Sequence, residues 1–246
     1  MSMLPTWQQQ ARMGDAQAQY DLALAMIHGQ HGSPQDPQGA FPWLEKAAAQ
    51  GHVDAIFQLG LAYLSGRGIA KDGNKAFDLF CQAAEKGSVD AAFYIATMYY
   101  TGDVLPQDMA EAGRWFLLAA DQGHQIAQYN IAMMYLQGIG LPADREQGLH
   151  WLQQCAEGGL AFGQVQLASF YSSGQYVSQD DYLAFHWMKK AALQNQAAAM
   201  YNVGVMYAKG MGVMQNEGES VNWYQQAARA GFDPARQELQ RRGLGW

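Results

Sequence analysis

The sequence contains few charged residues, and its basic residues are scattered. Only 15% of the 246 residues are Asp, Glu, Lys or Arg, and the formal net charge is −7. The only basic doublets are Lys189-Lys190 and Arg241-Arg242. Proteins that bind nucleic acid or an anionic membrane surface neutralise phosphates with a basic stripe. The composition therefore argues against both classes of partner.

Long apolar runs are also missing. The first 30 residues include Arg12 and Asp15 and do not read as a secretory signal peptide. No later segment has the length and apolar character of a membrane span. We therefore expect a cytoplasmic protein, and removal of a leader would leave a periplasmic location open.

The sequence does contain one pattern that recurs six times at a spacing of 36 residues. A tryptophan marks five copies, and Leu79 takes its place in the remaining one: Trp43, Trp115, Trp151, Trp187 and Trp223. A pair of small residues follows in every copy: Ala47-Ala48, Ala83-Ala84, Ala119-Ala120, Cys155-Ala156, Ala191-Ala192 and Ala227-Ala228. A fixed period of this length is typical of stacked supersecondary units.

The first half of each copy predicts a helix, named helix A. In the second copy, four residues follow the i, i+3, i+4, i+7 spacing of a helix buried on one face: Ile56, Leu59, Gly60 and Tyr63. The small residue at Gly60 allows another helix to approach closely. Gly66 follows the last periodic residue, and glycine supplies the left-handed turn that ends a helix.

The second half of each copy predicts helix B. It begins at an Asp or Asn, whose side chain accepts a backbone N–H of the first turn: Asp36, Asp72, Asp108, Asp144, Asp180 and Asn216. In the second copy we expect helix B over about 73–86, ending at Gly87. Asn195 replaces this glycine once, and Asn tolerates positive φ. In the first copy, Pro42 predicts a kinked or late-starting helix.

These patterns predict an all-α solenoid that forms a single domain over residues 1–246. Six antiparallel helix pairs are expected over residues 15–232. Residues 1–14 and 233–246 are expected to form capping helices. The last helix is predicted to begin with Asp233 as its N-cap.

Two segments carry a family resemblance. Ala197–Gly212 reads AAAMYNVGVMYAKGMG, and Trp115–His124 reads WFLLAADQGH. The chain resembles the Sel-like repeat family, a relative of the tetratricopeptide repeat, over about residues 15–232. The resemblance implies a right-handed superhelix and a scaffold or adaptor that binds proteins. Bacterial members act in signalling, in host interaction and as immunity proteins against secreted toxins. Secreted members often join helix A to helix B by a disulfide, and this chain lacks those cysteines.

The chain has only two cysteines, Cys81 and Cys155. Two repeats separate them, which corresponds to about 20 Å when packed helices lie about 8–10 Å apart. A disulfide needs Cα atoms within about 7 Å. We therefore expect free thiols, with Cys155 buried at an alanine position and Cys81 partly exposed.

No catalytic, cofactor-binding or metal-binding residue is predicted. The periodic aspartates are expected to be N-caps, and the periodic aromatic residues are expected to be core. His150 and His186 occupy the same position in adjacent copies, about 10 Å apart, which is too far to share one zinc ion. His28 and His31 flank the first turn without a third ligand nearby. We expect a non-enzymatic protein without a cofactor.

A second stripe on helix A is the candidate binding surface. Its last two positions are large and apolar in most early copies but small or polar in the last two: Ser169, Ser172, Val205 and Ala208. These positions either pack against the neighbouring helix A or form an exposed apolar groove. By resemblance to the tetratricopeptide repeat, the stripe faces the concave side. The predicted partner site is therefore the first four copies: Leu24, Ile27, Leu61, Leu64, Thr97, Tyr100, Met133 and Leu136.

Two functions fit this surface. The first is a scaffold or adaptor that binds a peptide or protein in the concave groove. The alternative is a stoichiometric inhibitor, of the immunity type, that blocks an effector enzyme. Both require a protein partner, and we expect the chain itself to be monomeric.

Overall fold

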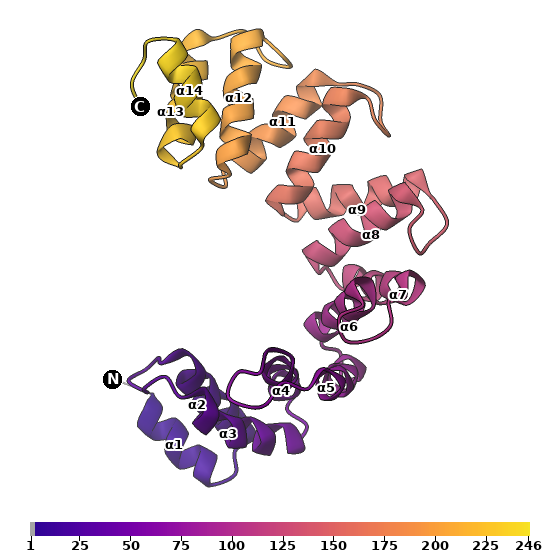
Figure 1. Cartoon of the computed structure of the whole chain (residues 1–246), viewed down its shortest axis with the longest axis vertical. Coiled ribbons are helices and arrows are strands. Elements are labelled where there is room, and N and C mark those ends of the chain that lie inside the picture. Colours follow the sequence, from indigo (N-terminus) through magenta and orange to yellow (C-terminus); the bar gives the residue numbers. More distant parts are fainter. Residues whose placement is uncertain (1–2) are drawn as a thin grey trace. The chain divides into compact units, whose positions relative to one another are not determined.

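The computed structural model describes residues 3–246. In that range the chain forms fourteen α-helices and no strand (Figure 1), which confirms the predicted all-α repeat fold. The chain divides into two compact units, an N-terminal unit (Met1–His124) and a C-terminal unit (Gln125–Trp246). Residues 1 and 2 of the predicted N-terminal cap lie outside the described residues.

The helices alternate between the two types that the sequence predicts. After a first capping helix, the even-numbered helices up to α12 are helices A, and the odd-numbered ones up to α13 are helices B. The N-terminal unit contains α1 (Leu4–Arg12), α2 (Ala16–His28), α3 (Pro37–Ala49), α4 (Val53–Ser65), α5 (Gly73–Glu85), α6 (Val89–Thr101) and α7 (Met109–Asp121). The C-terminal unit contains α8 (Gln125–Gln137), α9 (Arg145–Glu157), α10 (Ala161–Ser173), α11 (Asp181–Ala192), α12 (Ala197–Lys209), α13 (Glu217–Arg229) and α14 (Asp233–Arg241).

The helix ends follow the predicted capping residues. Asp72 accepts the backbone N–H of Lys75 at 3.0 Å at the start of α5, and the other five predicted residues cap their helices in the same way. Gly66 ends α4 with φ +73°, and Asn195 takes φ +62° where glycine is replaced. The periodic aspartates are therefore structural, as the sequence indicates.

Two helix starts differ from the prediction. α3 does not start late, because Asp36 caps it and Pro37 occupies its first turn, and the helix continues through the exposed Pro42. The N-cap of α14 is Phe232 rather than Asp233. The ring of Phe232 packs against Tyr201 of α12, with ring centroids 5.5 Å apart.

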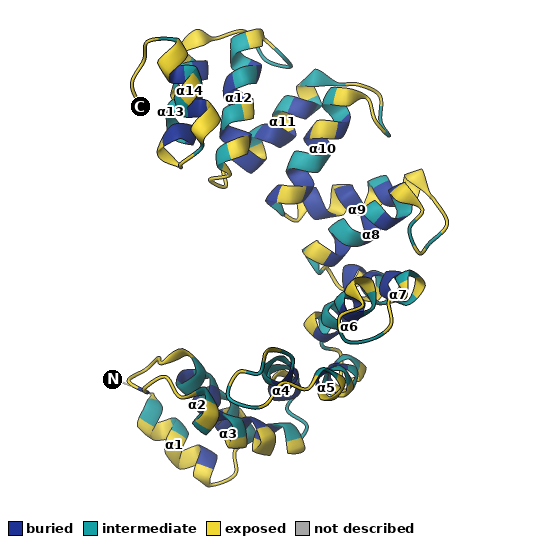
Figure 2. Ribbon diagram, in the orientation of Figure 1, coloured by how far each residue is buried: buried dark blue, intermediate teal, exposed yellow. Residues whose placement is uncertain are grey.

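Within each repeat, helix A packs closely on helix B through its small residue. A Cβ atom at Gly60 would lie 2.7 Å from Cε1 of Phe80, whose side chain is fully buried. A Cβ atom at Gly204 would lie 2.8 Å from the ring of Tyr224. In each repeat the buried faces of helix A and helix B turn toward each other, and the exposed residues lie on the outer faces of the pair (Figure 2). The predicted stripe of helix A is thus the core of each pair.

The turn after helix A packs on the start of the preceding helix B. Gly68 has φ +82°, and a Cβ atom there would lie 2.6 Å from the carbonyl oxygen of Pro37 at the start of α3. Gly212 has φ +67°, and a Cβ atom there would overlap the carbonyl of Asp181 at the start of α11. These two glycines fix the turns that carry Arg67 and Met211.

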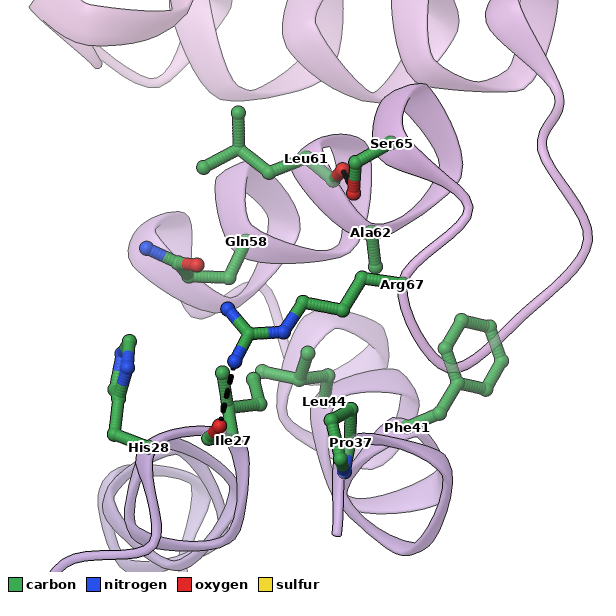
Figure 3. Close-up of a pocket in the computed structure, with 10 residues that line it drawn as sticks. All are labelled: Ile27, His28, Pro37, Phe41, Leu44, Gln58, Leu61, Ala62, Ser65 and Arg67. Carbon is green, nitrogen blue, oxygen red and sulfur yellow. Dashed lines mark hydrogen bonds between the residues drawn. The ribbon is translucent and has the colours of Figure 1, made fainter. Parts of the chain in front are cut away.

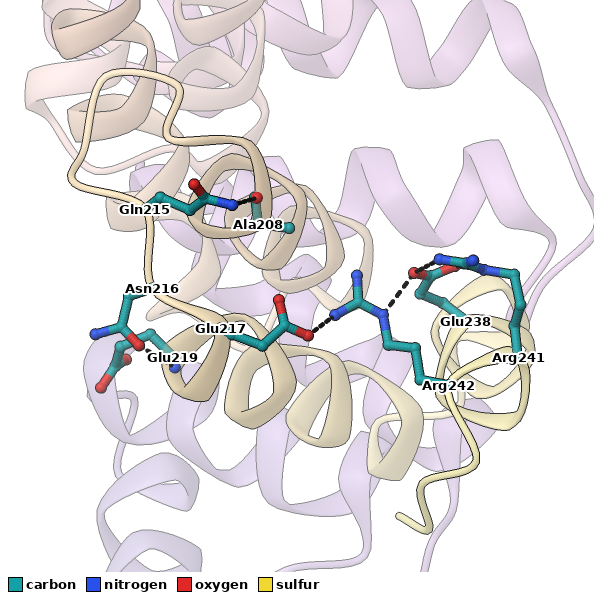
Figure 4. Close-up of polar contacts among 8 residues, drawn as sticks. All are labelled: Ala208, Gln215, Asn216, Glu217, Glu219, Glu238, Arg241 and Arg242. Carbon is teal, nitrogen blue, oxygen red and sulfur yellow. Dashed lines mark hydrogen bonds and ion pairs between the residues drawn. The ribbon is translucent and has the colours of Figure 1, made fainter.

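A charged network attaches the last helix to α13 (Figure 4). Arg242 forms ion pairs with Glu217 of α13 and, at 2.7 Å, with Glu238 of α14. Arg241 also binds Glu238 at 2.7 Å. Hydrogen bonds from Arg241 and Arg242 lower the pKa of Glu238 to about 2.

We predict that Gly212→Ala destabilises the C-terminal unit by at least about 2 kcal/mol. An alanine would adopt an unfavourable positive φ and would also displace the Asp181 backbone. Gly218→Ala is the matched control, because Gly218 is exposed in α13 and a Cβ atom there would make only an ordinary contact, at 3.4 Å, with Asn216 Oδ1. Alanine should be neutral there or stabilise by up to about 1 kcal/mol. Urea unfolding measures both variants, and equal stability of the two would contradict the proposed turn packing.

We predict that the contribution of Glu238 to stability depends on pH. The folded-state pKa of Glu238 lies below its unfolded value of 4.5, so its ion pairs stabilise α14 fully above about pH 4.5 and lose that effect as the pH falls toward about 2. Glu238→Gln should lower the melting temperature at neutral pH and change it little near pH 2. A constant difference between the two proteins across this range would refute the prediction.

Candidate functional site

A pocket of about 300 Å³ lies between α2, α3 and α4 in the N-terminal unit (Figure 3). It is named the α2–α4 pocket. Its apolar lining includes Ile27 of α2, Phe41 and the buried Leu44 of α3, and Leu61 of α4. Consecutive helices A therefore form its two sides, with helix B between them.

Arg67 gives the α2–α4 pocket a positive charge. Its side chain extends from the turn after α4 toward α2, where Nη2 donates a hydrogen bond to the carbonyl oxygen of Ile27 at 2.8 Å (Figure 3). His28, Gln58 and Ser65 are the other hydrogen-bonding side chains of the lining. None of the ten residues that line the pocket is acidic.

A second pocket, of about 360 Å³, lies between α10, α11 and α12 in the C-terminal unit. It is named the α10–α12 pocket. It occupies the same place in the repeat, because seven of its eleven lining residues are at positions equivalent to residues of the α2–α4 pocket. The equivalents lie four 36-residue periods later in α11, α12 and the following turn, and one residue more than that in α10, because the first repeat has 37 residues. Equivalent pairs include Leu44 and Met188, Leu61 and Val205, and Arg67 and Met211.

The α10–α12 pocket differs in its chemistry. Serines and Asn202 supply its polar groups, and no charged residue lines it. A smaller pocket of about 180 Å³ adjoins it, sharing Val165 and Asn202, and includes the ring of Phe162, which is 70% exposed. Together the two pockets form an uncharged groove along α10.

The structure brings two of the eight predicted residues into a shared pocket. Ile27 and Leu61 line the α2–α4 pocket, whereas Leu64 lines a shallower depression with Val104. Tyr100 is 42% exposed. Leu24 and Thr97 are half-buried in the N-terminal unit. Met133 of α8 is half-buried in the C-terminal unit.

Leu136 requires a correction, because it is only 7% exposed. Its side chain packs over Gly148 of α9, where a Cβ atom would lie 2.6 Å from Leu136 Cγ. Leu136 is therefore core rather than accessible surface.

The sequence analysis missed the α10–α12 pocket and the exposed ring of Phe162. Ser169 and Ser172 are outside the predicted partner site, which favours large apolar residues, yet such small side chains leave space between the helices. Phe162 and Ile126 are the second residues of their helices A, at the position where the N-terminal unit has Asp54 and Asp90. This change from an acidic to an apolar side chain is the sequence signal that could have indicated an apolar surface on the helices A of the C-terminal unit.

Four histidines outside the α2–α4 and α10–α12 pockets have structural contacts. His52 caps α4 by accepting the N–H of Ala55 at 3.3 Å. His124 stacks on Phe93 at 4.3 Å, and burial lowers its pKa. His150 and His186 each lie edge-on to the following tryptophan, with ring centroids 5.4 Å apart. In residues 3–246 no three potential metal ligands are grouped together.

Both cysteines are free thiols. Cys155 is buried, as predicted, and burial raises its pKa to about 11. Cys81 is partly exposed, and burial is the main cause that raises its pKa as well. The reactive thiolate form is therefore disfavoured at both positions. None of the described helices has the length and apolar character needed to cross a membrane.

Solved structures similar to this chain have the same repeat fold. The protective antigen c5321 of uropathogenic Escherichia coli, which displays an SLR fold, is 31% identical with a TM-score of 0.88; the match covers 96% of this chain and 50% of the antigen. This chain thus spans half the length of that protein. A Sel1 repeat protein from Oxalobacter formigenes is 31% identical with a TM-score of 0.79, and the match covers 89% of both chains.

A more distant structure is the immunity protein Pa5087 from Pseudomonas aeruginosa. It is 19% identical with a TM-score of 0.52, and the match covers 89% of this chain and 83% of that protein. This likeness concerns the fold alone.

The family comparison covers nearly the whole chain. A comparison with curated proteins finds no match. The Sel1 repeat model matches six times in succession, at residues 16–52, 53–88, 89–124, 125–160, 161–196 and 197–232. The six matches coincide with the six helix pairs from α2 to α13. The chain therefore belongs to the Sel1 repeat family.

Proposed function

We propose that this protein is a non-enzymatic scaffold that binds an extended segment of a protein partner along its helices A. Sel1 repeat proteins typically mediate protein–protein interaction, and the repeat is generally a non-enzymatic scaffold fold. The observation that carries the proposal is the recurrence of a pocket at the same place in the repeat in both units. A polypeptide presents side chains at regular intervals, so repeated pockets suit it well.

The size and lining of the pockets support a peptide ligand. Volumes of about 300 and 360 Å³ lie at the lower end of the range for small-molecule sites, and they suit single side chains. Each apolar side chain buried in such a pocket would contribute about 1.5–3 kcal/mol. Two or three such anchors would give a stable complex.

Each copy also offers a polar side chain as a partner for a peptide backbone. The position of Gln58 holds a hydrogen-bonding side chain in every copy: Asp21, Gln58, Tyr94, Asn130, Gln166 and Asn202. All six are half-buried or exposed. An extended peptide leaves its backbone N–H and C=O groups unpaired, and side chains at this position would bind them.

The test is selection of peptides from a random display library on the full chain, followed by affinity measurements on four variants. Ser65→Trp and Ser169→Trp place a large side chain at the α2–α4 and α10–α12 pockets from exposed positions. Gln82→Trp and Gln153→Trp are matched controls on exposed positions of helices B. A pocket variant should weaken peptides that use its pocket by about 10- to 100-fold.

The controls should bind like the wild type. If both pocket variants also retain wild-type affinity for every selected peptide, the pockets are not the binding sites and the proposal fails.

The stoichiometric inhibitor is the alternative function. The likeness to Pa5087 does not favour it, because that likeness concerns the fold alone. The same experiment separates the two functions. An inhibitor of the immunity type would select no peptide and would bind only a folded enzyme, whereas a scaffold for extended segments would select peptides.

A further inference from the structure

The two equivalent pockets differ most at a single position. Arg67 lines the α2–α4 pocket, and Met211 takes its place in the α10–α12 pocket. Both residues lie in turns of the same geometry, because the backbone N–H of Arg67 bonds to Ala62 and that of Met211 bonds to Met206. At this position Arg67 is also the only cation among the six copies, where the others have Gln30, Asp103, Ile139, Gln175 and Met211.

The hydrogen bond of Arg67 to α2 is not needed to complete that helix end. The carbonyl oxygen of Ile27 already accepts a hydrogen bond from Gln35 Nε2 at 3.2 Å. The corresponding carbonyl of Tyr100 is satisfied by the equivalent loop glutamine alone, at 2.8 Å. The carbonyl of Ala208 is likewise satisfied by Gln215, at 2.9 Å (Figure 4). Capping of the C-terminal end of α2 therefore does not explain why an arginine occupies position 67.

The guanidinium group of Arg67 has capacity for a ligand. It carries five N–H donors, of which one binds Ile27. It forms no ion pair with an acidic side chain in residues 3–246. A guanidinium pairs best with a carboxylate, because two parallel N–H donors match the two oxygens.

We propose that the α2–α4 pocket binds the C-terminal residue of a partner protein, with an apolar side chain against Ile27, Leu44 and Leu61 and the terminal carboxylate on Arg67. The proposal rests on the proposed function and specifies its ligand in the N-terminal unit. Arg67 is the specificity-determining residue. The α10–α12 pocket, with Met211 at this position, binds an uncharged segment.

A chain terminus fits this pocket better than an internal acidic residue. The pocket holds only about 300 Å³, so the apolar group and the carboxylate must lie within one residue of each other. In an extended peptide, successive side chains point to opposite faces. An apolar side chain and an adjacent acidic side chain would therefore not enter the same pocket, whereas a terminal residue carries both groups itself.

The test is an NMR titration of the full chain with small probes. N-acetyl-leucine carries the apolar side chain and the carboxylate, N-acetyl-leucinamide lacks the charge, and N-acetylglycine lacks the side chain. N-acetyl-leucine should shift the methyl signals of Ile27, Leu44 and Leu61, and it should bind about tenfold more tightly than the amide. N-acetyl-leucyl-aspartamide, which carries its carboxylate on a side chain, should bind as weakly as the amide.

Two variants of Arg67 complete the experiment. Arg67→Met introduces the residue found at the equivalent position of the C-terminal unit and should abolish the preference for the carboxylate. Arg67→Lys keeps the charge without the paired donors and should retain part of it. Arg67 is exposed, so both variants should keep the wild-type helical content.

Three results would overturn the proposal: equal affinity for the acid and the amide, an unchanged preference in Arg67→Met, or no shift at the pocket methyl groups up to the solubility limit of N-acetyl-leucine. If N-acetyl-leucyl-aspartamide binds as tightly as N-acetyl-leucine, an internal acidic residue can supply the carboxylate. That result would refute the assignment of the ligand to a chain terminus. If Ser65→Trp still weakens selected peptides in any of these cases, the scaffold function stands and only the specificity fails.

Discussion

The close contact between the small residue of helix A and the large side chain of helix B is the interaction on which the rest of the structure depends. Gly60 leaves room for Phe80, and Gly204 leaves room for Tyr224. Any side chain at these two positions would push the helices apart, because protein cores have little free volume. The pair therefore forms the rigid element of each repeat. The space between consecutive helices A is determined instead by the side chains that line it.

This difference explains why the α2–α4 and α10–α12 pockets form at the same place in the repeat. The two sides come from neighbouring helices A, helix B lies between them, and the turn after the second helix A completes the lining. Gly68 and Gly212 hold that turn against the start of the preceding helix B. The scaffold thus presents one variable residue, Arg67 or Met211, at a fixed location in each unit. A change of ligand preference requires only a change of that side chain and its neighbours.

The helix pairs were predictable because their determinants are local. The cap at Asp72, the turn at Gly66 and the buried stripe around Leu59 each depend on residues within a few positions of one another. The Asp233 prediction was wrong by one residue: the N-cap of α14 is Phe232, whose ring contacts a preceding helix rather than residues nearby in the sequence.

The candidate site was only partly predictable, because it depends on pairs of residues from different helices. Leu136 is buried because α9 has Gly148 where the facing helices of most other copies have alanine. The stripe of helix A alone does not contain that information. Ser169 opens a pocket because it is small, whereas the prediction favoured large apolar residues. Arg67 received no role, because the carbonyl that it binds lies 40 residues earlier in the chain.

Hydrogen–deuterium exchange on the full chain, with and without a bound partner, tests the central claim most directly. The account predicts slower exchange in α2 and α4, or in α10 and α12, when a selected peptide or the native partner is bound. Exchange at the outer faces of α3 and α11 should not change. Protection confined to helices B or to the C-terminal cap, with no change in the helices A that line the pockets, would contradict the account.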